Sequence, residues 1–121
     1  MRNPVMQIMK TTGAVLLVGG LALAQAMAAE ATAADEGKAI AENRTKGNCF
    51  ACHDYPGAVL PGNVGPKLIN MKARYPEREK LRAQIWDASK KNANTIMPPF
   101  GRFHVLTEKE IDAVVEWVYT L

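Results

Sequence analysis

The chain reads CFACH from Cys49 to His53, and this short stretch decides which kind of fold the chain can adopt. Two thiols at this spacing can each add to one of the two vinyl groups of a haem. The adjacent imidazole then lies beneath the iron and can serve as its proximal ligand. We therefore expect one covalently attached haem c, bound through Cys49 and Cys52, with His53 on the iron.

The same motif is also compatible with a thioredoxin-like redox pair or with half of a zinc site. A zinc site needs a second Cys or His pair, and the sequence has only two Cys and two His. A thioredoxin-like pair needs a strand–helix–strand context, and no alternating strand pattern is present. A small exported domain often needs disulfides or a bound metal or cofactor to be stable, and two cysteines this close make a poor structural disulfide. The haem interpretation is therefore favoured.

The N-terminus has the three-part layout of a secretory signal peptide. Arg2 and Lys10 make it positive, residues 13–24 are mostly apolar, and Ala-x-Ala patterns end at Ala26 and Ala28. A retained membrane anchor is the alternative, but the apolar run is short for a span of roughly 20 residues. We expect cleavage after Ala28, or after Ala26, and a periplasmic location for the mature chain.

Removal of this segment changes the charge of the protein. The full chain has 15 basic and 12 acidic residues and a net charge of +3, and loss of Arg2 and Lys10 leaves about +1. No cluster of Lys and Arg remains that would follow a phosphate backbone. The sequence therefore argues against a nucleic-acid partner.

Downstream of the signal peptide, helical patterns alternate with loops, which predicts a small all-α domain wrapped around the haem. Residues 29–35 are expected to form a flexible leader and residues 36–121 the folded domain. Pro and Gly residues between Asp54 and Pro66 indicate an ordered loop. The helices are expected at residues 35–45, 67–73 and 76–89 and after Thr107.

The last helix has the most complete signature in the sequence. Thr107 fits its N-cap, and Glu110 completes a capping box. An apolar stripe at helical spacing follows, which predicts a face packed against the core. The stripe consists of Ile111, Val114, Val115, Val118 and Leu121.

The second axial ligand of the iron should be a thioether or an imidazole from further along the chain. Met97 precedes Pro98 and Pro99. Because a proline keeps the preceding residue out of helical geometry, Met97 is expected on a loop that can cross the haem. Met71 is assigned to the core, and His104 to the surface or to packing. We therefore expect Met97 on the iron, with His104 as the main alternative.

Two further residues are expected near the haem. The carbonyl oxygen of Pro66 is expected to accept the Nδ1–H of His53, which would fix the ring and its tautomer. The alternative is a plain turn before a helix. The indole N–H of Trp86 can reach a haem propionate, or the ring can simply pack. Trp117 is expected at the haem edge or at a helix crossing.

These features in this order are similar to class I cytochromes c, in which a haem motif is followed by Gly-Pro-x-Leu, a late Met-Pro and a final helix. More specific segments resemble SoxX, the small monohaem subunit of SoxAX cytochromes in periplasmic thiosulfate oxidation. The resemblance covers nearly all of the mature chain. The segments read LPGNVGPKL at 60–68, AQIWDA at 83–88, MPPFG at 97–101 and VYTL at 118–121.

The resemblance implies a heterodimer with a larger SoxA-like haem subunit. That subunit hosts the sulfur chemistry, in which thiosulfate is joined oxidatively to a cysteine of the SoxYZ carrier. This chain would be the electron-transfer subunit of a thiosulfotransferase complex. It would accept the electrons and pass them to a downstream acceptor, with no catalytic residue of its own and no stable membrane anchor.

One departure from the class I pattern concerns the crossing of the first and last helices. In that pattern a glycine close before the haem motif makes the crossing. Here Gly37 lies further upstream, and Ala41 is expected to take its place. The haem ligands are not affected by this difference.

Three other functions remain as alternatives. The first is a free-standing soluble electron-shuttle cytochrome c, which would not copurify with a second cytochrome. The second is a haem enzyme such as a peroxidase, which needs an open or displaceable sixth position on the iron. The third is a thiol–disulfide protein, which would have no haem absorption after export.

Overall fold

The computed structural model describes residues 25, 27–28 and 32–121 and divides the chain into two compact units, Met1–Ala31 and Thr32–Leu121. Apart from residues 25, 27 and 28, the predicted signal peptide lies outside the described residues, as do residues 29–31 of the predicted leader. The expected boundaries at residues 28 and 35, and the cleavage site, therefore stay predictions. No helix among the described residues is long and apolar enough to cross a membrane.

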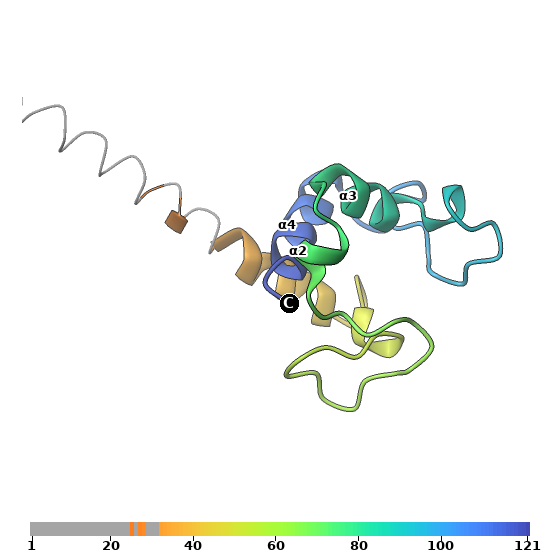
Figure 1. Ribbon diagram of the computed structural model, residues 1–121, viewed down its shortest axis with the longest axis horizontal. Helices are drawn as coiled ribbons and strands as arrows, with labels where there is room; N and C mark the ends of the chain where they lie inside the picture. The colour runs from red at the N-terminus through yellow and green to blue at the C-terminus, as the bar shows by residue number, and fades with distance from the viewer. Residues whose placement is uncertain (1–24, 26, 29–31) are drawn as a thin grey trace, which may run out of the picture. The chain divides into compact units, whose positions relative to one another are not determined.

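The second unit consists of short helices joined by long loops (Figure 1). No β-strand occurs in the part of the chain that the structure describes, which confirms the predicted all-α fold class. The loop predicted from Asp54 to Pro66 has no helix either. Residues 32–42 are helical and are followed by η3 (Cys49–Ala51), α2 (Met71–Arg74), α3 (Arg78–Trp86), η4 (Ala88–Lys90) and α4 (Glu108–Val118).

The observed helices differ from the predicted ones at their ends, for local reasons. The first is already helical at residue 32 and ends at residue 42. α2 begins only at Met71 because Asn70 has a left-handed backbone, with φ of 53°, which a right-handed helix cannot include. α3 ends at Trp86 because Asp87 is extended, with φ of −157°, and η4 follows as a separate turn.

α4 has the N-terminal structure that its sequence predicts. The Thr107 hydroxyl oxygen accepts from the Glu110 amide at 3.2 Å, and Glu110 Oε2 accepts from the Thr107 amide at 2.9 Å. The apolar stripe is buried from Ile111 to Val118, and Leu121 is half-buried. The predicted capping box and inward-facing stripe are therefore confirmed.

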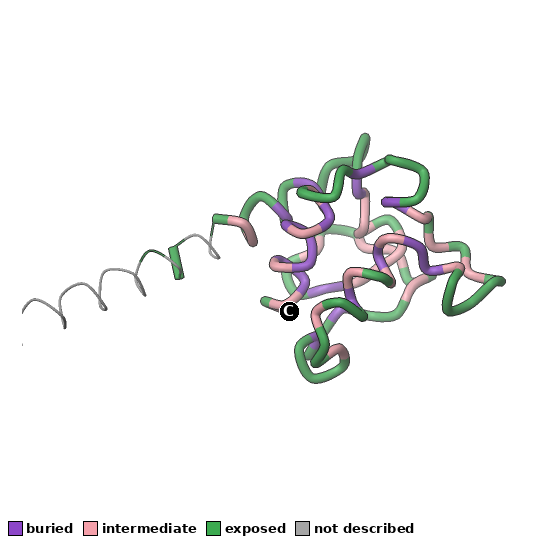
Figure 2. The backbone as a smooth tube through the Cα atoms, turned by 90° about the horizontal axis from the view of Figure 1, so that it is seen from above, coloured by how far each residue is buried: buried purple, intermediate pink, exposed green. Residues whose placement is uncertain are grey.

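The core of this unit lies where α4 packs against α3 and against the helix at residues 32–42. Buried stretches of the backbone follow the helices, while long exposed stretches follow the loops (Figure 2). Arg78 pairs with Glu116, and Arg82 with Asp112, each at 2.8 Å, across α3 and α4. Pairs this exposed contribute roughly 0–1 kcal/mol each, so apolar burial dominates the contact.

The first helix crosses α4 at Gly37, which corrects the expectation that Ala41 takes this position. A Cβ at residue 37 would lie 2.0 Å from the Ala113 carbonyl oxygen, so the two backbones touch. Ala41 is fully buried as well, and it lies about one turn further along the same helix. Because residue 32 is already helical, Gly37 lies well inside the helix, where a close crossing needs a residue without a side chain.

Replacing Gly37 by alanine therefore tests the crossing. The exchange is expected to destabilise the haem-loaded protein by about 1–3 kcal/mol, because an inserted methyl group must push two backbones apart. At an exposed helical position, replacing glycine by alanine stabilises the folded protein by roughly 0.5–1 kcal/mol. The sign of the stability change therefore shows whether residue 37 touches α4. Denaturant unfolding measures the effect, with Lys38→Ala on the exposed face as control. A Gly37→Ala protein as stable as the parent would show that the helices do not touch here.

Candidate functional site

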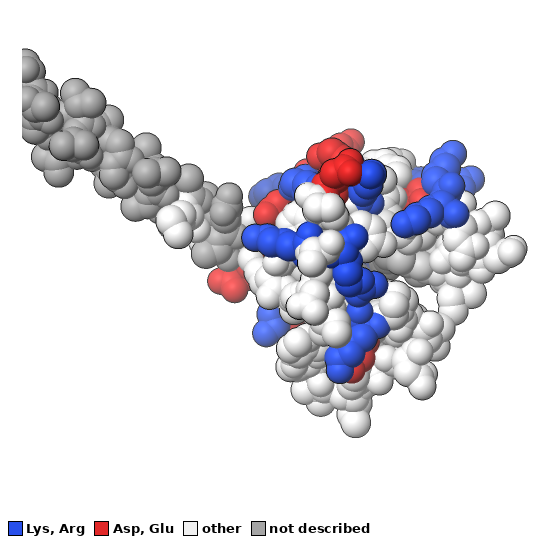
Figure 3. Space-filling view, in the orientation of Figure 1, with Lys and Arg blue, Asp and Glu red and all other residues white. Residues whose placement is uncertain are grey.

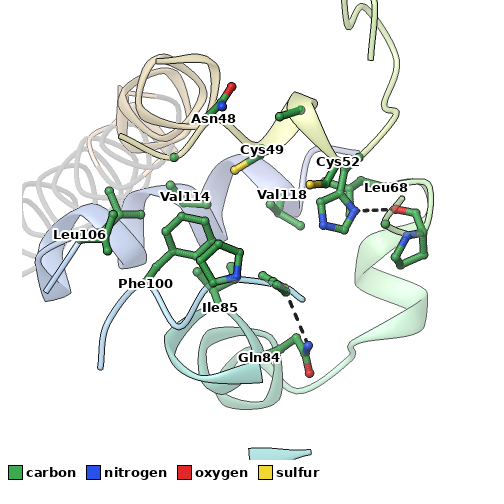
Figure 4. Close-up of a pocket in the computed structure, with 18 of the residues that line it drawn as sticks. Asn48, Cys49, Cys52, Leu68, Gln84, Ile85, Phe100, Leu106, Val114 and Val118 are labelled. Atoms are coloured by element: carbon green, nitrogen blue, oxygen red, sulfur yellow. Dashed lines mark hydrogen bonds between the residues drawn. The ribbon is translucent and has the colours of Figure 1, made fainter. Parts of the chain in front are cut away.

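The Cys-x-x-Cys-His motif lies on a tight turn after the first helix. Asn48 has a left-handed backbone, with φ of 46°, and Cys49–Ala51 then wind into η3. The His53 amide donates to the Cys49 carbonyl oxygen at 2.9 Å, which closes the turn. This conformation brings Cys49, Cys52 and His53 to the wall of a single cavity (Figure 4).

The cavity has a volume of about 510 Å³ and lies among η3, α2, α3, α4 and two loops. The loops are residues 52–70 and residues 91–107. The volume falls within the roughly 300–1,000 Å³ of ligand sites in proteins. Most of the wall is apolar, as such sites require. The apolar side chains on it include Leu68, Leu81, Ile85, Phe100, Leu106, Val114, Trp117 and Val118.

His53 is held in one orientation by the loop that follows it. Its Nδ1–H donates to the Pro66 carbonyl oxygen at 2.7 Å, which is the bond that the sequence predicts. A neutral imidazole with the proton on Nδ1 leaves the lone pair of Nε2 available to a metal. Gly65 lies against the ring, and a Cβ there would be 2.5 Å from Cε1 of His53. The loop therefore fits only around this placement of the imidazole.

The two thiols lie in surroundings that differ from those of exposed cysteines. Both are free and half-buried. Burial raises the pKa of the Cys49 thiol to about 11. A backbone hydrogen bond lowers this pKa, and the nearby Cys52 raises it. Since the thiolate is the reactive form in disulfide exchange, Cys49 is poorly suited to redox chemistry of the thioredoxin kind at neutral pH.

Met97 lies on a non-helical loop, as predicted, and lines the same cavity as the cysteines. Its amide donates to the Thr95 hydroxyl oxygen at 3.2 Å. Its sulfur accepts a hydrogen bond from Nε2 of Gln84 at 3.9 Å. Gln84 lies across the cavity from Cys49 and Cys52 (Figure 4). Met97 is thus on the cavity wall with the haem motif and is held by a donor from α3.

Sequence reasoning missed Gln84. The signal was present, because Leu81, Gln84 and Ile85 have the spacing of one helical face and both apolar members are buried. A polar residue on an otherwise inward-facing stripe needs a partner, and here the partner is the Met97 sulfur.

The other candidates for the second axial position are placed differently. Met71 is buried, as expected for a core residue, although its side chain also lines the cavity. Its sulfur accepts a hydrogen bond from Arg74 Nη1 at 3.3 Å. His104 is exposed, has a left-handed backbone with φ of 53°, and is not among the residues that line the cavity. Of the two methionines, Met97 alone lies on a loop.

Trp86 is the predicted site residue that the structure does not bring to the cavity. It lines a separate surface hollow together with Arg82 and Arg102. The reason is helical register, since Trp86 follows the inward-facing Ile85 and is rotated by about 100° from it. Its expected role at a haem propionate stays a prediction. Trp117 does line the cavity, and it makes an edge-on contact with Tyr55 at a centroid distance of 5.0 Å.

Comparison with known families agrees with this geometry. A family model described as cytochrome C oxidase, cbb3-type, subunit III matches residues 32–118. The chain belongs to this family. It is therefore a c-type cytochrome, an electron-transfer protein with covalently bound haem. The match supports c-type cytochromes in general and not SoxX in particular. No curated protein matched the chain.

The residues of the cavity fit a haem c. Cys49 and Cys52 can form the two thioether bonds, and the apolar wall suits a large macrocycle. His53 presents an imidazole whose tautomer is set by Pro66. When bound, the haem supplies one-electron redox chemistry. The protein supplies two thiols for the attachment, the imidazole of His53 and an apolar wall.

Proposed function

We propose that His53 and Met97 are the axial ligands of the haem c attached to Cys49 and Cys52, and that the chain carries single electrons. The observation that carries this proposal is the position of Met97 on the wall of the cavity that His53 and both cysteines line. Each proposed ligand is also oriented by a hydrogen bond, from His53 to Pro66 and from Gln84 to Met97. Such second partners are typical of residues that bind a metal.

This ligand set favours an electron carrier over a haem enzyme. With both axial positions taken by side chains, no position is left for a substrate to bind the iron. A thioether also prefers ferrous over ferric iron and so raises the reduction potential. Electrons then enter and leave at the haem edge, which needs a docked partner and no covalent step.

At a finer level, we propose that the chain is the SoxX-like subunit of a periplasmic SoxAX complex. The segments that carry the resemblance also supply the cavity wall. LPGNVGPKL contains Gly65 and Pro66, AQIWDA contains Gln84, and MPPFG contains Met97 and Phe100. The segments that resemble SoxX therefore surround the proposed ligands. Sequence differences at such positions change how the ligands of a metal are oriented and tuned.

The proposed contact with the SoxA-like subunit lies near the haem edge, on the segments Asp54–Gly62 and Pro98–Phe103. Both are loops that flank proposed ligands, and both expose large apolar side chains. Leu60 is 92% exposed and Phe103 is 64% exposed. Lys and Arg side chains form a band over α2 on one face (Figure 3). Exposed apolar patches with a polar rim are typical of interfaces.

The test uses the haem-loaded chain, a SoxA-like protein and the SoxYZ carrier from the same organism, and thiosulfate. We expect a stable heterodimer in size-exclusion chromatography. Within the complex, thiosulfate and SoxYZ should reduce the haem of this chain, as followed by its absorption spectrum. The chain alone, with the same carrier and thiosulfate, should stay oxidised.

Two results would overturn the finer proposal and leave the c-type cytochrome in place. One is conjugation of thiosulfate to the carrier by the purified chain alone. The other is the absence of any complex with the SoxA-like protein, which would favour a free-standing shuttle cytochrome. Leu60 and Phe103 are exposed, so substitutions there test the proposed contact. Leu60→Ser should weaken the complex without changing the haem spectrum.

Gln84→Leu tests whether the amide tunes the proposed thioether ligand. A hydrogen bond withdraws electron density from sulfur, so its loss should strengthen sulfur donation to ferric iron. We expect the ferrous-to-ferric ratio at fixed potential to fall by less than tenfold, a shift of less than about 59 mV for a one-electron couple. Spectroelectrochemistry measures this shift. Ala83→Ser, at an exposed position on the same helix, serves as control, and equal shifts in both variants would contradict the role of Gln84.

A further inference from the structure

The loop that carries Met97 has no regular structure of its own. Residues 92–106 contain no helix, and the Met97 amide is bonded only within the loop, to Thr95. A side chain on such a loop can stay at the cavity only if other elements hold the loop in place. The residues that hold this loop therefore also position Met97.

The C-terminal end of α3 makes the backbone connection to this loop. The carbonyl oxygen of Trp86 accepts hydrogen bonds from the amides of Gly101 and Arg102, at 3.1 and 3.3 Å. The loop also lies directly on the Trp86 side chain. A Cβ at residue 101 would be 2.2 Å from Cδ2 and Cε3 of the indole, so only glycine permits this approach.

Asp87, the residue after Trp86, adds an ionic connection to the same loop. Among the described residues, Asp87 is the charged residue that is buried, with 3% of its surface exposed. Its Oδ1 accepts hydrogen bonds from the amide and hydroxyl of Ser89. Its Oδ2 accepts none and lies 3.5 Å from Nη1 of Arg102. A buried carboxylate oxygen without a hydrogen bond depends on this guanidinium for compensation.

The carboxyl group of Asp87 is ionised at neutral pH. Hydrogen bonds from Ser89 hold the pKa of Asp87 below its ordinary value, and the charges of Arg102 and Lys90 act in the same direction. Within the described residues, Met97 to Leu106 make their hydrogen bonds and ion pairs outside the loop to Gln84, Trp86 and Asp87. All three lie at the end of α3.

We propose that Trp86, Asp87, Gly101 and Arg102 form a clamp that holds the Met97 loop closed over the cavity. The four are positioning residues, since Trp86 and Asp87 hold the loop through its own Gly101 and Arg102, and none of the four lines the cavity. The proposal rests on Met97 as an axial ligand. It assigns to Trp86 a structural task that differs from the contact with a propionate expected from sequence. The clamp sets how often Met97 leaves the iron and so how well the ferric protein resists foreign ligands.

The test measures the affinity of the ferric, haem-loaded chain for imidazole, which competes with Met97. Arg102→Gln removes the guanidinium, and we expect the affinity for imidazole to rise about tenfold. Arg102→Lys keeps the charge and should recover part of the loss. Lys109→Gln, which removes the same charge from an exposed position on α4, should leave the affinity unchanged.

The same measurement in a Met97→Ala background separates a clamp from other effects. With the sulfur gone, Arg102→Gln should cause no further rise, because the loop no longer competes. An equal rise in both backgrounds would mean that Arg102 affects bound imidazole directly and not through Met97, and an unchanged affinity in Arg102→Gln alone would mean that there is no clamp. Either result would overturn the proposal.

Two further outcomes are informative. If Met97→Ala by itself leaves the imidazole affinity unchanged, the ligand assignment is wrong and the clamp proposal falls with it. If Met97→Ala raises the affinity and Arg102→Gln does not, only the clamp fails. If the Arg102→Gln protein does not fold with haem, Asp87→Asn provides a second variant. It preserves the acceptor for Ser89 and removes the charge that faces Arg102.

Discussion

Replacing Met97 by alanine is expected to open one axial position of the haem iron. The parent protein should be low-spin and six-coordinate in both oxidation states, and the variant should bind imidazole or cyanide readily. Loss of the thioether should also lower the reduction potential by on the order of 100 mV, since axial ligands set haem potentials over a range of about 0.8 V. Optical spectroscopy and spectroelectrochemistry measure these changes.

The structure provides two matched controls for this variant. Met71 also lines the cavity but belongs to the core, so the volume-conserving Met71→Leu should keep the six-coordinate spectrum. His104 is exposed, and His104→Ala should behave as the parent does. An unchanged spectrum and potential in Met97→Ala would assign the second axial position to Met71 or His104 instead.

The second large effect is expected when both Cys49 and Cys52 are replaced by serine. Without thioether bonds the haem should not remain on the chain, and the domain should then fail to fold. The cavity of about 510 Å³ is lined by many residues of the apolar core. Emptying it would cost on the order of 10 kcal/mol at about 24 cal/mol per Å³, which is comparable to the entire stability of a domain of this size.

Two measurements test this expectation. In a denaturing gel, the parent chain should stain for haem, the single variant Cys52→Ser weakly or not at all, and the double variant not at all. In thermal unfolding, the parent should show a cooperative transition and the haem-free chain a broad one without fixed tertiary structure. Extraction of the haem from the parent by acidic organic solvent would rule out covalent attachment, and a cooperative haem-free transition close to that of the parent would rule out the dependence on haem.

Features that depend on neighbouring residues could be derived from the sequence alone. The thiol spacing of Cys49 and Cys52 determines the attachment chemistry, and the capping box at Thr107 determines where α4 begins. Met97 was placed on a loop because Pro98 restricts its backbone. In each case the relevant forces act within a few residues, so the order of residues is enough.

Features that depend on how distant segments pack were decided only by the tertiary structure. The sequence does not show that Gly37 rather than Ala41 meets α4, because the level of a crossing depends on how two helices pack along their whole length. Helical spacing indicates that Gln84 turns inward, but it does not show that Gln84 meets the Met97 sulfur or that Trp86 meets Gly101, because both contacts join α3 to a distant loop. Local chemistry thus determined the cofactor, and long-range packing determined what surrounds its ligands.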